Sequence, residues 1–156
     1  MIFTNLAFPR EFDDNGAIQR IVIHHAAGTS TVEAIHKYHI SKGWNGIAYH
    51  YVVDKDGSIY VGRPENAMGA GCTGYNYGAI HICFNGNYNK EQLSKAALKS
   101  GLRLLVDLMK KYPNAYPKQP SFLIFTLILM MVITPLYAKS VLLFLDTTAI
   151  LCMKKN

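Results

Sequence analysis

The sequence has few cysteines, and its last 36 residues contain neither histidine nor glycine. Its three cysteines are an odd number without C-x-x-C spacing, which argues against a disulfide framework and against a self-contained zinc knuckle. Charged residues make up only 17% of the chain and apolar residues 50%, a composition that excludes a disordered protein. The 156 residues should therefore fold around one core as a single globular domain with reduced thiols.

The net charge of +6 is spread along the chain as single Lys and Arg residues. Proteins that bind nucleic acids more often cluster these residues with interleaved aromatics, so we expect no nucleic-acid partner. Weak attraction to anionic cell-wall or membrane surfaces fits the charge equally well. The first residues lack a basic segment followed by an apolar run, which predicts a protein made in the cytoplasm without a signal peptide.

Hydrophobic patterns and turn residues predict an α/β fold with a mixed central β-sheet flanked by helices. A capping box at Ser30 and Glu33 predicts a helix over 31–42, and Asn89 with Gln92 predicts a second helix over about 90–112. Asp56 and Gly57 lie in a turn between two β-branched segments, which is typical of a hairpin. The predicted strands cover residues 18–24, 48–54, 58–62 and 79–84.

The composition changes near residue 115, which divides the chain into a domain at 1–115 and an apolar tail at 116–156. Within the tail, residues 121–138 carry no charge, and their number is at the lower limit of about 17–25 residues for a membrane-spanning helix. We expect either a membrane segment at 121–138 or the product of a frameshift in the gene. Resequencing codons 112–120 separates the two.

Histidines are the first candidates for chemistry. His24 and His25 close a predicted buried strand, and neutral imidazoles on a rigid strand end are good zinc ligands. Adjacent strand residues point to opposite faces, so only one of the two can serve a given site. His36 and His39 have a spacing that can bind metal, but they also share the apolar stripe of their helix, which favours packing against the sheet.

An ordered series of short motifs resembles the zinc-dependent N-acetylmuramoyl-L-alanine amidases, a family that includes phage endolysins and is related to the peptidoglycan recognition proteins. The likeness covers about residues 18–114. The motifs that carry it are IVIHH at 21–25, HKYH at 36–39, GWNGIAYHYVV at 43–53, DG at 56–57, GR at 62–63, GYN at 74–76 and GNY at 86–88.

The resemblance implies hydrolysis of the amide between the lactyl group of N-acetylmuramic acid and the first L-alanine of the stem peptide. It implies His24 as a metal ligand and Tyr49 as the residue beside the metal that assists the reaction. The implied stacking on a sugar face falls on Trp44 or Tyr75, and the implied amide pairing with the stem peptide falls on Asn76. The implied partner is peptidoglycan, the implied place of action is the cell wall, and an endolysin would also need a holin-like pore.

Two departures from the family pattern change what we expect of this chain. Family members often have His where Gly71 stands, and they complete the zinc site after the long helix with a second His and a Cys. Beyond residue 115 this sequence has no His, and its only Cys there is Cys152. With His24 as the one matching ligand the zinc site is incomplete, because a catalytic zinc needs about three protein ligands. We therefore expect impaired activity, or alternatively an inactive peptidoglycan-binding module, tethered to a membrane if 121–138 spans one.

Overall fold

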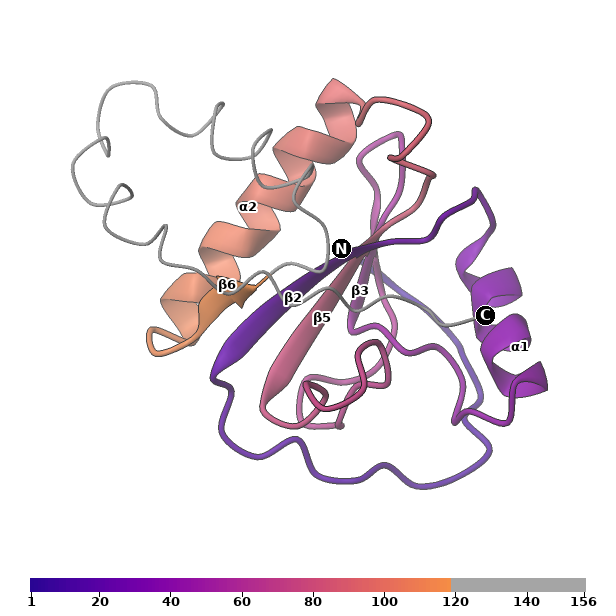
Figure 1. The fold of residues 1–156 in the computed structure, drawn as a ribbon, viewed down its shortest axis with the longest axis vertical. Coiled ribbons are helices and arrows are strands. Elements are labelled where there is room, and N and C mark those ends of the chain that lie inside the picture. Colours follow the sequence, from indigo (N-terminus) through magenta and orange to yellow (C-terminus); the bar gives the residue numbers. More distant parts are fainter. Residues whose placement is uncertain (119–156) are drawn as a thin grey trace.

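The computed structural model describes residues 1–118, in which two helices accompany a six-stranded sheet (Figure 1). The elements are β1 (Ile2–Phe3), β2 (Arg20–His25), α1 (Val32–Ser41), β3 (Tyr51–Val53), β4 (Ile59–Val61), β5 (Ala79–Phe84), α2 (Lys95–Lys111) and β6 (Tyr116–Lys118).

The strand order is β1-β4-β3-β5-β2-β6, so the sheet is mixed. β3 and β4 form the predicted antiparallel hairpin, whose turn residue Gly57 has a φ of +87° that favours glycine. All other neighbouring strands are parallel. The predicted α/β class with a mixed central sheet is confirmed, and β2, β3 and β5 form its middle.

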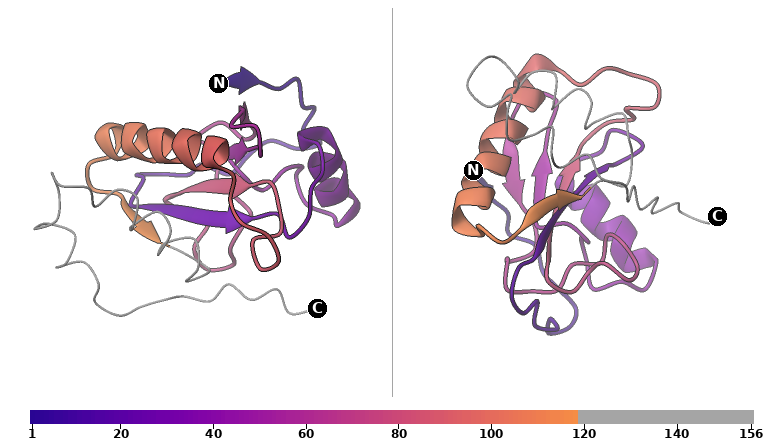
Figure 2. Two further views of the ribbon diagram at one scale, coloured as in Figure 1. Left: turned by 90° about the horizontal axis from the view of Figure 1, so that it is seen from above. Right: turned by 60° about the vertical axis from the view of Figure 1, so that its left-hand side comes forward.

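α2 lies across one face of the sheet (Figure 2, left) and buries the larger apolar cluster. Gly101 allows the helix to approach closely, because a Cβ there would overlap the ring of Phe84. This cluster contains the side chains of β2, β3 and β5 that point toward α2, together with the helix residues facing them, among them Ile21, Ile23, Ile80, Ile82, Phe84, Leu104 and Leu108.

Both helices begin at residues other than those predicted. Thr31 rather than Ser30 caps α1, because the Thr31 hydroxyl accepts a hydrogen bond from the Ala34 N–H. α2 begins at Lys95, later than the predicted residue 90, because Ser94 is its cap and accepts from the Ala97 N–H. The Ser94 hydroxyl also donates to the carbonyl of Lys55, which ties the start of α2 to the hairpin turn.

The edge strands β1 and β6 were not predicted. β6 pairs with Arg20, Ile21 and Val22 of β2, just beyond the boundary placed at residue 115. Within residues 1–118 no helix is both long enough and apolar enough to span a membrane. The candidate membrane segment at 121–138 lies outside the described residues.

Candidate functional site

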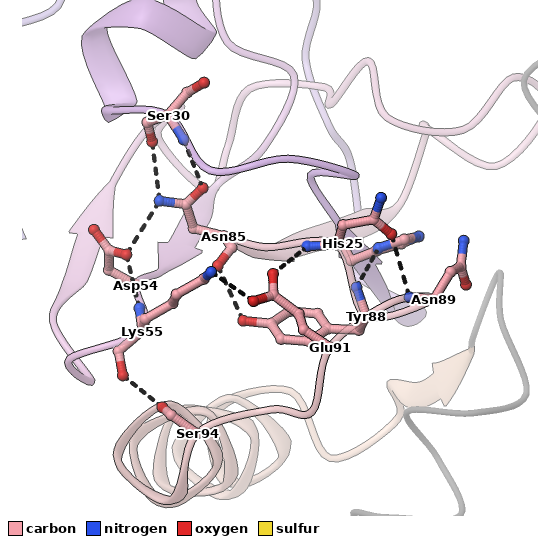
Figure 3. A network of polar contacts seen from close by, with 10 residues as sticks. His25, Ser30, Asp54, Lys55, Asn85, Tyr88, Asn89, Glu91 and Ser94 are labelled. Carbon is pink, nitrogen blue, oxygen red and sulfur yellow. Dashed lines mark hydrogen bonds and ion pairs between the residues drawn. The ribbon is translucent and has the colours of Figure 1, made fainter.

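The two histidines at the end of β2 lie on opposite faces of the sheet. His24 is 8% exposed, and its Nε2 lies 2.8 Å from Nδ1 of His81 in β5. Figure 3 shows His25 beside the loop that follows β5, where its Nδ1 accepts a hydrogen bond from the Tyr88 N–H at 3.2 Å. This arrangement follows from strand alternation and leaves His24 alone to serve a site on the face away from α2.

A continuous row of aromatic rings runs from the surface to the interior on this face. Tyr49 lies beside His24, with ring centroids 5.3 Å apart. Trp44, which is 38% exposed, forms the outer end of the row. The neighbouring pairs are Trp44–His39 at 4.7 Å, His39–Tyr49 at 5.6 Å, Tyr49–His24 at 5.3 Å, His24–His81 at 5.1 Å and His81–His50 at 5.8 Å.

The inner imidazoles are uncharged at neutral pH. Burial, and to a smaller extent the nearby charge of His25, lowers the pKa of His24 to about 3. Burial also lowers the pKa of His50 to about 4, although its hydrogen bond to the Ala67 carbonyl acts in the opposite direction. The pKa of His81 is well below its usual value for the same reason, burial. These three imidazoles are therefore neutral rings that can accept hydrogen bonds or donate electron pairs.

Arg63 fixes the loops beside the row. Its guanidinium is buried and donates to the carbonyls of Asn45, Ile47 and Met68. Burial lowers the pKa of Arg63 to about 10, which leaves the group charged at neutral pH. Because one rigid donor group binds three carbonyls, the segment that carries Trp44 is held in place against the sheet.

The α1 histidines are part of the packing, as the helical stripe predicted. His36 accepts a hydrogen bond at Nδ1 from the Ile47 N–H, and His39 accepts one at Nδ1 from the Ala48 N–H, both at 3.1 Å. Both side chains are buried. They orient the segment that leads to Tyr49.

The predicted groove residues Tyr75 and Asn76 lie in the loop that precedes β5. The Tyr75 ring lies 5.7 Å from the guanidinium of Arg20, which is at the opposite end of β2 from His24. Asn76 accepts a hydrogen bond from the Cys72 N–H at 2.9 Å, so its side chain stabilises its own loop. Substrate contact by Trp44, Tyr75 and Asn76 stays a prediction.

Comparison with known proteins identifies the family. Residues 14–130 match the family model described as N-acetylmuramoyl-L-alanine amidase. The chain belongs to this amidase family. Since the match covers well over half of the sequence and includes β2 to β6, the fold and the family agree.

Relatives with solved structures and relatives known by sequence agree with this assignment. The amidase LysC from Clostridium intestinale superimposes with a TM-score of 0.73 at 35% identity, covering 76% of this chain and 80% of that protein. The endolysin of Escherichia phage T7 is 29% identical over 114 residues, covering 67% of this chain and 76% of the endolysin.

Peptidoglycan-recognition protein SC2 of Drosophila melanogaster is 37% identical over 100 residues. That match covers 58% of this chain and 54% of the fly protein, so the chain spans about half the length of this relative. The N-acetylmuramoyl-L-alanine amidase family to which the chain belongs thus includes both endolysins and peptidoglycan-recognition proteins among the chain's relatives.

The amidase family is generally zinc-dependent, but the donors among residues 1–118 do not fit a zinc ion. In this part of the chain, no three His, Cys, Asp or Glu side chains lie close enough together to hold a metal. His24, the ligand implied by the family likeness, directs Nε2 at His81 instead. Cys152 lies outside the described residues.

Sequence reasoning did not place His50, His81 or Arg63 at the site of this amidase fold. His50 was read only as part of a strand, and Arg63 only as part of a family motif. His81 lies in the strand predicted at 79–84 and in none of the motifs that carry the family likeness. The signal that could have found it is a histidine inside an otherwise apolar central strand, where a polar ring needs a partner.

Proposed function

We propose that this chain binds peptidoglycan on the face of the sheet that carries His24 and Tyr49. The observation that carries the proposal is the contact between these two rings, which joins the predicted reaction centre to the exposed Trp44 through His39. Support also comes from the relatives, which are named as endolysins, amidases and peptidoglycan-recognition proteins.

In this proposal each residue has a distinct task. Trp44 offers an exposed ring against which a sugar face can stack, and Arg63 keeps the loop of Trp44 rigid. The Tyr49 hydroxyl is assigned to hydrogen bonding with the lactyl–L-alanine amide next to His24. Tyr75 and Asn76, in the loop before β5, are assigned to contact with the stem peptide.

Hydrolysis of the lactyl–L-alanine amide is the second candidate function. The pairing of His24 with Tyr49 favours it, and so does the likeness to endolysins. It requires metal ligands from outside residues 1–118, since the described donors do not form a zinc site. We therefore propose slow hydrolysis or none, with binding as the main activity.

The proposed place of action is the cell wall. Membrane contact through residues 121–138 and passage through a holin-like pore are further parts of this proposal. Fractionation of cells that produce the chain tests the first part: tail-dependent recovery in the membrane fraction supports a tether, and recovery only in the supernatant contradicts it.

Co-sedimentation of the full chain with purified peptidoglycan tests the binding proposal. We expect Trp44→Ala to weaken binding about five-fold or more, since loss of a stacked aromatic anchor typically costs more than 1 kcal/mol. Phe3→Ala is the matched control, because Phe3 is another exposed aromatic and lies on the edge strand β1. Equal binding by the wild-type chain and both variants would contradict the assignment of Trp44, and no binding at all would contradict the proposed function.

Release of new amino termini from the same peptidoglycan tests the second candidate. We expect the wild-type chain to release few or no new amino termini. Tyr49→Phe is the matched variant, because it removes only a hydroxyl. Rapid release that Tyr49→Phe abolishes would establish hydrolysis as the main activity instead.

A further inference from the structure

The contact between His24 and His81 is set by the register of two central strands. β2 and β5 are parallel, with Val22 opposite His81 and His24 opposite Cys83. His24 and His81 therefore share a face and are offset by two residues along the strands. The His81 ring bridges this offset and brings its Nδ1 to 2.8 Å from Nε2 of His24, with the two ring planes 20° apart.

Two glycines make room for this contact. A Cβ on Gly71 would lie 2.8 Å from Nδ1 of His81 and 3.0 Å from Nε2 of His24. A Cβ on Gly69 would overlap Cδ2 of His81. Neither glycine has a positive φ, so it is space and not backbone conformation that excludes a side chain. The backbone of Gly69 and Gly71 thus lies directly against the imidazoles, and the segment 69–71 forms a strap over them.

The distance between the nitrogens identifies a direct hydrogen bond. Two nitrogens that share a tetrahedral zinc at about 2.0–2.1 Å each are about 3.3–3.4 Å apart. At 2.8 Å the two rings instead share one hydrogen between their nitrogens. His81 Nε2 is buried and has no hydrogen-bond partner among the described residues. A buried N–H without a partner is rarer than an acceptor without one, so we assign the hydrogen to Nδ1 of His81, which donates it to Nε2 of His24.

We propose that His81 is a built-in competitor for metal at His24: its Nδ1–H engages the Nε2 electron pair of His24 under the strap formed by residues 69–71. This inference rests on the assignment of His24 as the metal position in the proposed function. In this chain His24 then has a protein partner where a metalloenzyme would have its ion. His81 is a positioning residue, because it acts only through His24.

The competition has a size that can be measured. A metal ion that binds only when His24 is released from His81 has a reduced apparent affinity. The reduction is set by the fraction of molecules in which His24 is free. One net hydrogen bond in a protein corresponds to a factor of about five in such an equilibrium. Removing the donor should therefore strengthen zinc binding at His24 about five-fold.

Two variants of the full chain separate the hydrogen bond from the volume of the ring. His81→Ala removes the donor. His81→Asn is the matched control, because its amide nitrogen is attached at the same distance from Cβ as Nδ1 of histidine and can still donate to His24. The probe is Zn²⁺ alone, added to ¹⁵N-labelled protein, with the His24 imidazole resonances as the readout and the ¹⁵N–¹⁵N coupling across the hydrogen bond as a second readout. No peptidoglycan is present, so this test can fail while the binding test succeeds, and the reverse.

The expected result is a coupling between His24 and His81 in the wild-type chain that equimolar zinc leaves unchanged. His81→Ala should then show the His24 signal responding at about one fifth of the zinc concentration that the wild type needs, and His81→Asn should behave like the wild type. Three results would overturn the proposal: no coupling in the wild type, loss of the coupling on addition of equimolar zinc, or zinc binding that His81→Ala leaves equal or weakens. Equal behaviour of His81→Asn and His81→Ala would also overturn it, since ring volume would then be the cause. If His81→Ala does not fold, the wild-type coupling and its response to zinc decide the matter alone.

Discussion

The two faces of the central sheet are built from different kinds of residue. The face toward α2 is an almost wholly apolar cluster closed by a helix. The opposite face buries His24, His50 and His81, and it is covered in part by loops and by glycine backbone. Both faces contain an apolar cluster, and the cluster beneath α2 is the larger, so we expect the greatest losses of stability from changes there. The histidine face also buries polar groups, whose burial is costly unless they have partners.

The largest expected effect is on the α2 face. Phe84 is buried beneath Gly101, and truncating a buried Phe to Ala typically destabilises a protein by about 3–5 kcal/mol. We expect Phe84→Ala to lower the free energy of unfolding in urea by that amount. Val106→Ala is the control, since Val106 is 46% exposed on the same helix and should change stability by less than about 0.5 kcal/mol. Similar losses for the two variants would show that α2 does not stabilise the fold as described.

The strap on the histidine face gives the next effect. Gly69→Ala places a Cβ against the His81 ring, and overpacking of this kind costs about 1–3 kcal/mol. The loss should largely disappear in the double variant with His81→Ala, because the clash is between these two residues. Gly28→Ala is the control, since a Cβ there meets nothing within 4 Å. If the stability losses of Gly69→Ala and His81→Ala simply add in the double variant, the strap does not press on His81.

The buried imidazoles predict acid sensitivity. His50 is neutral in the folded state because burial lowers its pKa from 6.5 to about 4, so below pH 6.5 the unfolded state binds the proton and the folded state does not. Stability is therefore lost as the pH falls from about 6.5 toward 4. His50 alone should remove about 2 kcal/mol between pH 7 and pH 5.

Urea unfolding at several pH values measures this loss, with His50→Asn as the matched variant. The asparagine can still accept from the His81 N–H but does not titrate, so the wild type should lose more stability on acidification than the variant does. Parallel pH profiles for the two proteins would be incompatible with a neutral buried His50.

Much of the fold could be predicted from sequence patterns, and each wrong prediction has a physical cause. The strand at 79–84 agrees with β5 because six consecutive buried residues leave a strong pattern. The short strands β3 and β4 were found through the turn signal at Asp56 and Gly57, whereas β1 and β6 are equally short and lack such a signal, and Pro117 argues against a strand. The start of α2 was misplaced because the pattern at Asn89 and Gln92 does not cap the helix, and Ser94, which also contacts the distant Lys55, caps it instead.

Only part of the candidate site could be predicted from the sequence. The family likeness named His24 and Tyr49, and strand alternation explains why His25 points elsewhere. The contact of His24 with His81 depends on the register of two parallel strands that are separated by more than fifty residues. Local patterns contain no information about such a register, so the partner of His24 emerges only from the fold.

The most direct test of this account asks which face meets peptidoglycan. A soluble muramyl peptide that contains the lactyl–L-alanine amide is titrated into the labelled full chain, and the NMR signals of both faces are followed. We expect shifts at Trp44 and Tyr49, whereas Leu104 and Leu108 on the buried side of α2 stay unchanged. Shifts confined to the α2 side, or no shifts at saturating ligand, would contradict the claim that the histidine face is the functional one.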